Sequence, residues 1–318
     1  MQKRRQHYVH RAYLRPWAKE GKVWCLRKGK VFSANLMKVA NEKHFYKLQE
    51  LTQEDVSFIE NFAIAQSPEG LRPLHRNILR AFTVPFKAKS AAESTGSIAE
   101  NLLPTIDEAV ANTEEDYQMM IETRLQPFLD SMLAGDAGFY ADDEKLTTFL
   151  YATAVQYFRT KKVKESVIAL AEERFKNIRR VWNVLSHIYA TNVAYTLFSE
   201  RYDFRISLAN NRTETPFIAG DQPVINVHAP PSRDARPAEL EFYYPLSPQR
   251  AMFLNKTSKN NCAKWPEVSE QEVYHYNLLV ARNSHEQVFS NSEAALKEIQ
   301  EQLQPSAPSL VSEPRPLR

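Results

Sequence analysis

The sequence contains little glycine, little cysteine and no long hydrophobic run. Seven glycines among 318 residues exclude collagen-like and other glycine-rich repetitive proteins. Cys25 and Cys262 lie far apart and neither belongs to a C-x-x-C pair, so we expect reduced core thiols rather than a zinc or redox motif. The longest nearly apolar run, residues 149–158, is about half as long as a membrane-spanning helix. Because no apolar signal segment opens the sequence, we expect a cytoplasmic protein without membrane contact.

The residues that are present predict a globular protein. Apolar residues make up 43% of the chain, which is enough for a substantial buried core. We expect one domain over residues 1–303, with a basic N-terminal element and hairpin (1–50), a helical part (51–200), and a sheet with closing helices (201–303). Residues 304–318 are rich in proline and serine, which predicts a disordered tail.

Positive charge is concentrated at the start of the chain. The formal net charge is +3, but residues 1–30 hold ten lysines and arginines and a single acid, Glu20, so this block carries +9 and the remainder −6. Such a block can meet phosphate backbones, which predicts nucleic acid as a partner. The alternative is that several of these cations neutralise acidic helices of the same chain. The oligomeric state is left open by the sequence.

Changes in hydrophobic period predict an α+β fold. Apolar residues recur at helical spacing between residues 52 and 200, whereas short extended segments separated by turns follow Tyr202. We therefore expect a mainly helical part, a small and mostly antiparallel sheet, and an N-terminal hairpin at residues 23–32. Residues 87–97 are small, polar and without periodicity, which predicts a surface loop or a local disordered stretch.

Six short strings along the chain carry a family resemblance. They are residues 7–18 (HYVHRAYLRPWA), 40–46 (ANEKHFY), 154–160 (AVQYFRT), 216–224 (PFIAGDQPV), 244–248 (YPLSP) and 273–277 (VYHYN). In this order they resemble the uncharacterised bacterial family called domain of unknown function 4238. The resemblance implies that family's architecture over almost the whole chain, but the family offers no settled activity to carry over. His10 and Arg11 stand in place of the family's usual Pro-Gln, and Ala219-Gly220 in place of Thr-Ser.

Asp221 is the sharpest catalytic candidate. It lies between two short predicted strands in the string Gly-Asp-Gln-Pro-Val, where a carboxylate can bind a metal or act as a base. The alternative is an Asx-turn, in which the carboxylate accepts a hydrogen bond from its own backbone ahead of the proline. The Ala219-Gly220 departure removes two hydroxyls beside Asp221, so a mechanism that needs a hydroxyl there is in doubt.

His7, Arg11 and Arg15 form a second candidate. If their segment is helical, the four-residue spacing aligns one imidazole and two guanidiniums on one face, which predicts a phosphate clamp with a proton-transferring histidine. The alternative is an arginine row that pairs with acids of the helical part.

Arg159 and Asn277 complete the candidate set. Arg159 follows an apolar helical stripe, where a cation either caps the helix or reaches into a site. Asn277 lies in a predicted helix, where its amide either joins that helix to the sheet or lines a pocket.

These residues favour a phosphodiester-acting protein. We expect a nuclease or an RNA- or DNA-processing factor of a mobile element or defence locus, with His7 and Asp221 catalytic and Arg11, Arg15, Arg159 and Asn277 binding the substrate. The alternative is a non-catalytic sensor or protein-interaction module in which the same residues form a structural network. The sequence contains no phosphate-binding loop, dinucleotide fingerprint, zinc-protease motif or nucleophile elbow, and it identifies neither a cofactor nor a metal requirement.

Overall fold

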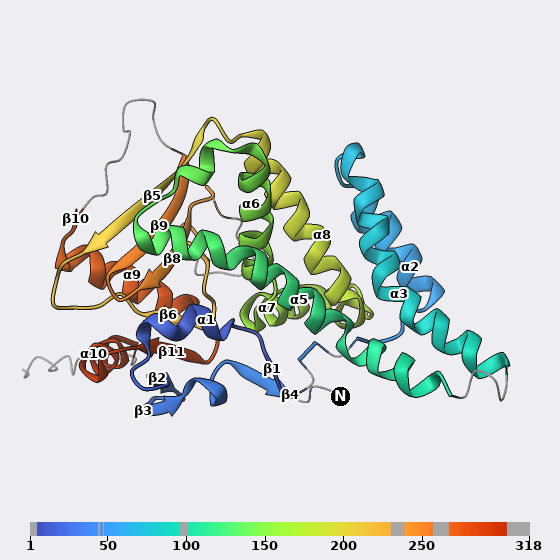
Figure 1. Cartoon of the computed structure of the whole chain (residues 1–318), viewed down its shortest axis with the longest axis horizontal. Helices are drawn as coiled ribbons and strands as arrows, with labels where there is room; N and C mark the ends of the chain where they lie inside the picture. The colour runs from blue at the N-terminus through green and yellow to red at the C-terminus, as the bar shows by residue number, and fades with distance from the viewer. Residues whose placement is uncertain are drawn as a thin grey trace, which may run out of the picture.

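The computed structural model describes residues 5–43, 45–46, 48–95, 101–229, 237, 239–256 and 267–303. Helices dominate these residues between Thr52 and residue 200, and short strands dominate from Phe204 to Lys256, so the predicted α+β class is confirmed. Figure 1 places most of the helical part on one side of the molecule and the sheets on the other. The predicted tail and Cys262 lie outside the described residues.

The N-terminal element contains the predicted hairpin. Its elements are β1 (Arg5–His7), α1 (Arg11–Leu14), the 3₁₀ turn η1 (Arg15–Trp17), β2 (Lys22–Arg27), β3 (Lys30–Asn35), the 3₁₀ turn η2 (Leu36–Lys38) and β4 (Asn41–Lys43). Strands β2 and β3 pair antiparallel, and β1 pairs antiparallel with β4. The hairpin turns at Lys28 and Gly29, whose φ angles of 51° and 68° lie in the left-handed region that glycine adopts without strain.

The helical part begins at a capping box. Thr52 accepts a hydrogen bond from the backbone of Asp55, and the Asp55 side chain accepts one from the backbone of Thr52. Asp142 and Thr160 cap two later helices in the same manner, with side-chain oxygens that accept from backbone N–H groups. The elements are α2 (Gln53–Phe58), the π-helical turn η3 (Ile59–Ile64), the 3₁₀ turn η4 (Glu69–Leu71), α3 (Arg72–Thr95), α5 (Leu103–Ala134), the 3₁₀ turn η5 (Gly138–Ala141), α6 (Asp143–Phe158), α7 (Lys161–Ala171) and α8 (Ile178–Ser199).

The predicted loop at residues 87–97 is wrong for its first nine residues. Helix α3 continues without interruption to Thr95, and residues 96 and 97 lie outside the described part of the chain. Lysine, alanine and glutamate in this stretch are good helix formers, and most of its side chains are exposed. The missing apolar period therefore reflects a solvent-facing helix rather than a loop.

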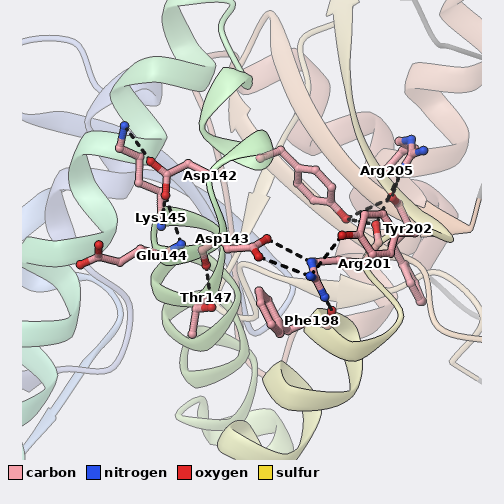
Figure 2. Close-up of polar contacts among 11 residues, drawn as sticks. Asp142, Asp143, Glu144, Lys145, Thr147, Phe198, Arg201, Tyr202 and Arg205 are labelled. Carbon is pink, nitrogen blue, oxygen red and sulfur yellow. Dashed lines mark hydrogen bonds and ion pairs between the residues drawn. The ribbon is translucent and has the colours of Figure 1, made fainter.

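An ion pair joins the first turn of α6 to the segment after α8. Arg201 donates from Nε to Asp143 Oδ1 at 3.0 Å and from Nη2 to Asp143 Oδ2 at 3.3 Å, as Figure 2 shows. Its guanidinium also lies over the rings of Phe198 and Tyr202, at 4.2 and 4.6 Å from their centroids. This contact joins the start of α6 to the end of α8.

Three sheets follow from the strands. A five-stranded sheet has the order β10-β5-β9-β8-β7, a four-stranded sheet has the order β3-β2-β11-β6, and β1 pairs with β4. All pairs are antiparallel except β10 with β5. The bounds are β5 (Phe204–Asn211), β6 (Ala219–Gly220), β7 (Ile225–Asn226), β8 (Phe242–Ser247), β9 (Arg250–Lys256), β10 (Glu267–Val268), α9 (Glu270–Asn283), β11 (Gln287–Ser290) and α10 (Glu293–Leu303).

The largest hydrophobic cluster draws on every part of the chain. It contains Tyr8 and Trp17 of the N-terminal element, apolar faces of α5, α6 and α8, and residues of the five-stranded sheet. Trp17 donates its indole N–H to the carbonyl of Phe217 at 2.7 Å. The single-domain organisation itself stays a prediction. Across the described ranges, no helix has the length and apolar character that a membrane crossing demands.

Candidate functional site

The N-terminal string meets α5 and α6 around one buried arginine. We call this group, made of His7, His10, Tyr46, Glu122 and Arg159, the Arg159 centre. Arg159 follows the last residue of α6 and is 4% exposed. Its Nη1 lies 2.6 Å from Glu122 Oε1, its Nε donates to the Tyr46 hydroxyl at 2.9 Å, and its Nη2 donates to the His7 carbonyl at 2.9 Å. Burial opposes the charge, but Tyr46 and Glu122 outweigh it and raise the pKa of Arg159 above its ordinary value.

Glu122 lies between the arginine and a histidine. Its second carboxylate oxygen is 3.4 Å from Nε2 of His10, the residue that precedes α1. Burial lowers the pKa of His10 below its ordinary value, and the nearby Arg159, Arg15 and Arg11 lower it further against the pull of Glu122. His10 is therefore a neutral imidazole at pH 7, partly open to solvent, with a carboxylate beside one ring nitrogen.

His7 is the second imidazole of the centre. Its backbone carbonyl accepts hydrogen bonds from Arg159 and from the Tyr46 hydroxyl, whereas its ring Nε2 is buried without a hydrogen-bond partner among the described residues. Burial and, next, the charge of Arg11 lower its pKa below the ordinary value. The charges of Glu122 and Arg159 thus act on both imidazoles.

The predicted helical row of His7, Arg11 and Arg15 does not form. His7 is the last residue of β1, which the pairing with β4 holds extended, while Arg11 opens α1 and Arg15 opens the following 3₁₀ turn. Both arginines are exposed, and Arg11 directs Nη1 at the sulfur of Met37. The structure therefore places two solvent-facing cations beside the centre, but not in one line with the histidine.

Asp221 lies directly after β6 and has no exposed surface. Its carboxylate accepts three backbone hydrogen bonds, from His285 at 2.7 Å, Glu286 at 2.9 Å and Gln287 at 3.0 Å. Burial raises the pKa of Asp221 above its ordinary value, although these donors oppose the rise. Asp221 therefore holds the segment between α9 and β11 rather than a turn of its own.

Gln287 links Asp221 to the N-terminal string. Its backbone N–H binds Asp221, its side-chain amide donates to the hydroxyl of Tyr8 at 2.8 Å, and its side-chain oxygen accepts from Ala40 at 3.2 Å. Tyr8 is the neighbour of His7. Asp221 and the Arg159 centre are thus joined through Gln287, Tyr8 and His7 in one bonded network. The Asp221 carboxylate itself contacts only backbone N–H groups in the hydrogen bonds described above.

Two further contacts tie the predicted positions together. Thr160 donates its hydroxyl to the side-chain oxygen of Gln222, which joins the residue after Arg159 to the residue after Asp221. Asn277 accepts from the backbone of Ile218 at 3.0 Å and donates to the carbonyl of Pro216 at 2.8 Å. Asn277 thereby fixes α9 against residues 216–218, as the joining alternative predicts.

A family model matches residues 5–294, which is most of the chain, and its description is Protein of unknown function (DUF4238). The chain belongs to this family. The suspected resemblance is confirmed, and the matched range contains every residue of the Arg159 centre together with Asp221, Gln287 and Asn277. No curated protein and no solved structure matches the chain significantly.

In this DUF4238 member, the sequence reading did not identify the acidic residues of α5. Glu114 and Glu122 lie two helical turns apart on α5, and Gln118 lies between them. Glu114 is 3% exposed, lies 3.0 Å from Nε2 of His187 and accepts from Gln118 at 2.8 Å. Its charge also acts on Tyr46 of the Arg159 centre. The sequence signal that could have identified them is the four-residue spacing of Glu114, Gln118 and Glu122 inside an amphipathic helix.

No group of three or more His, Cys, Asp or Glu side chains is arranged to hold a metal ion in the part of the chain that the structure describes.

Proposed function

We propose that this protein acts on phosphodiester bonds, as a nuclease or an RNA- or DNA-processing factor, and that the reaction takes place at the solvent-facing edge of the Arg159 centre. The observation that carries the proposal is His10. It is a neutral, partly exposed imidazole backed by Glu122 and flanked by the exposed Arg11 and Arg15. This combination supplies a proton acceptor next to cations that can hold phosphate oxygens.

In this mechanism His10 is the general base. A carboxylate beside Nε2 favours the tautomer with the proton on that nitrogen, which leaves Nδ1 to take a proton from water or from a 2′-hydroxyl. Arg11 and Arg15 bind the phosphate. His7 is the second proton-transferring group, because its ring Nε2 has no hydrogen-bond partner among the described residues and the ring lies within the electrostatic influence of the same glutamate and arginine.

Arg159, Asp221 and Asn277 take positioning roles in the revised proposal. The N–H groups of Arg159 are directed at Glu122, Tyr46 and His7, and Asp221 and Asn277 are engaged by backbone groups. Their geometry supports holding the N-terminal string in place rather than contact with substrate. The proposal places the protein in the cytoplasm, where its basic N-terminus meets nucleic acid.

The test is phosphodiesterase activity of the full chain on mixed single- and double-stranded RNA and DNA. We expect His10→Ala to lower kcat/KM by about a hundredfold or more, as loss of a general base does. Because its pKa is lowered, the acidic limb of the pH profile should lie below the ordinary histidine value of 6.5, with activity rising as pH rises through that limb. His275→Ala, which removes an exposed histidine of α9, is the matched control and should leave the rate unchanged. Equal rates for the two variants would remove the catalytic role of His10.

The second candidate is a non-catalytic sensor or protein-interaction module. The contacts of Arg159 with Glu122, Tyr46 and His7, and the three backbone hydrogen bonds to Asp221, favour it, because paired groups stabilise a fold without contacting a substrate. Absence of turnover on every substrate in the same assay, together with unchanged melting temperatures of the His10 variant, would favour this candidate over the first.

A further inference from the structure

A separate cavity of about 530 Å³ opens between α3, α5, α6 and α8. Its volume lies within the range of about 300 to 1,000 Å³ that is usual for small-molecule sites. The lining is largely apolar and includes Leu71 at the end of η4, Leu74 and Ile78 near the start of α3, Ile121 of α5 and Phe198 of α8. Leu74 is 47% exposed, so the apolar part of the lining is open to solvent.

The lining of the cavity also carries hydroxyl groups. The hydroxyls of Tyr117 and Tyr151 are 2.7 Å apart, and the side chain of Thr191 hydrogen-bonds with Tyr151. The Tyr117 ring packs edge-on against His187 at 4.8 Å, and His187 is held by the buried Glu114. Tyr117 is therefore fixed in position, with its polar end at the cavity.

Arg124 determines the charge that the cavity accepts. It is the one charged side chain among the described residues that line the cavity, and it lies on α5 close enough to Tyr117 for its charge to act on that hydroxyl. A guanidinium and a phenol hydroxyl together are donors for a carboxylate. The rest of the lining offers hydrocarbon and aromatic surface.

Thr147 and Phe198 mark the end of the cavity nearest the Asp143–Arg201 pair, and Figure 2 shows both residues beside that pair. Asp143 is engaged by Arg201 and does not line the cavity. A ligand with an anionic group at Arg124 can therefore extend an apolar chain toward this end of the cavity.

We propose that this cavity binds a medium-chain carboxylate, with its carboxylate at Arg124 and the Tyr117 hydroxyl and its hydrocarbon chain against Leu74, Ile78 and Phe198. The site is distinct from the Arg159 centre, so the proposal does not depend on phosphodiesterase activity. A neutral molecule of the same length gains the apolar contacts but not the contact with Arg124.

The experiment is isothermal titration calorimetry of the full chain with sodium octanoate, and with octan-1-ol as the neutral analogue. We expect saturable binding of octanoate, with an affinity about tenfold lower in Arg124→Gln and an unchanged affinity for octan-1-ol. Arg179→Gln, which removes an exposed arginine of α8 outside the cavity, is the matched control and should bind octanoate like the unaltered protein. Leu74→Glu should weaken binding of both ligands, because it places a carboxylate in the apolar part of the lining.

Circular dichroism of each variant establishes that it is folded before titration, and both substituted positions, Arg124 and Leu74, are exposed enough to tolerate the change. A dissociation constant weaker than about 1 mM for the unaltered protein would overturn the proposal. Equal octanoate affinities of Arg124→Gln and Arg179→Gln would overturn it as well, since binding would then be unspecific contact with apolar surface.

Discussion

The carboxylate of Asp221 is enclosed by the protein and accepts hydrogen bonds from three successive backbone N–H groups, 64 to 66 residues further along the chain. Transfer of an unpaired carboxylate from water to such an interior is costly, and three donors offset much of that cost. The same bonds satisfy three N–H groups that would otherwise lack this acceptor where α9 ends and β11 begins. One side chain thus determines the path of a distant segment.

Asp221→Asn tests this role. The amide keeps one oxygen as an acceptor but turns an NH₂ group toward a backbone N–H, so at least one buried donor loses its partner. We expect the free energy of unfolding to fall by about 1 to 3 kcal/mol in urea denaturation. Asp203→Asn, at an exposed aspartate, should change it by less than about 0.5 kcal/mol. A stable Asp221→Asn protein that loses phosphodiesterase activity would instead return Asp221 to the catalytic role that the sequence predicts.

At single positions the sequence identified polar residues inside apolar strings, but not their partners. His7, Arg159 and Asp221 lie in the bonded network, and Asn277 binds the backbone of Pro216 and Ile218. The Asx-turn alternative for Asp221 is wrong, because its donors belong to residues 285–287. Local patterns describe a residue's own neighbours, whereas these partners depend on β11 pairing with β6 in the folded chain.

Among the elements, helices α5 and α6 are joined across their buried faces by Arg159 and Glu122. The arginine side chain is 2% exposed and the glutamate 15%, at a separation of 2.6 Å. Removal of one member of such a pair leaves the other charge buried without compensation, which is worse than removal of both. The pair also supports the N-terminal string, because the same guanidinium binds the His7 carbonyl.

A double-mutant cycle measures this contribution. We expect Arg159→Met and Glu122→Gln each to lower the free energy of unfolding by about 3 kcal/mol, and the double variant to lose less than the sum of the two. The matched control is the exposed pair of Arg179 and Glu165, 3.4 Å apart, where the same substitutions should cost at most about 1 kcal/mol. Additive losses for Arg159 and Glu122 in urea denaturation would contradict a direct coupling between α5 and α6.

Element types were more accessible from the sequence than element boundaries. Hydrophobic period and caps such as Thr52 located the helical part, and the turn at Gly29 located the hairpin. The failure at residues 87–95 has a physical cause: an exposed helix face shows no apolar period to detect. Strand β11 was also missed, because its four buried residues form a short segment only three residues after α9 and pair with the distant hairpin.

For the molecule as a whole, the Arg159 centre is a product of tertiary structure. β1, α5 and the residues that flank α1, β4 and α6 contribute to it, so no local spacing could predict Glu122 beside His10 and Arg159. The same folding leaves Arg11 and Arg15 exposed within a terminal block of residues 1–30 that carries +9. Charge of this density, unmatched by acids of its own segment, is the feature that a nucleic-acid backbone would meet first.

Salt dependence of binding tests that encounter. Each phosphate contact releases condensed counterions, so the logarithm of affinity should fall linearly with the logarithm of salt concentration, by about 0.7 to 0.9 per contact. Arg11→Ala/Arg15→Ala should therefore make the slope shallower by about 1 to 2, measured by fluorescence anisotropy with a labelled oligonucleotide between about 50 and 200 mM salt. Lys256→Ala/Lys297→Ala removes the same charge from lysines paired with Glu200 and Glu293 and should leave the slope unaltered. Because both variants have the same net charge, an equal change in slope would show that only overall charge matters and that α1 does not face the nucleic acid. Undetectable binding of the unaltered protein at about 50 mM salt would remove the nucleic-acid partner altogether.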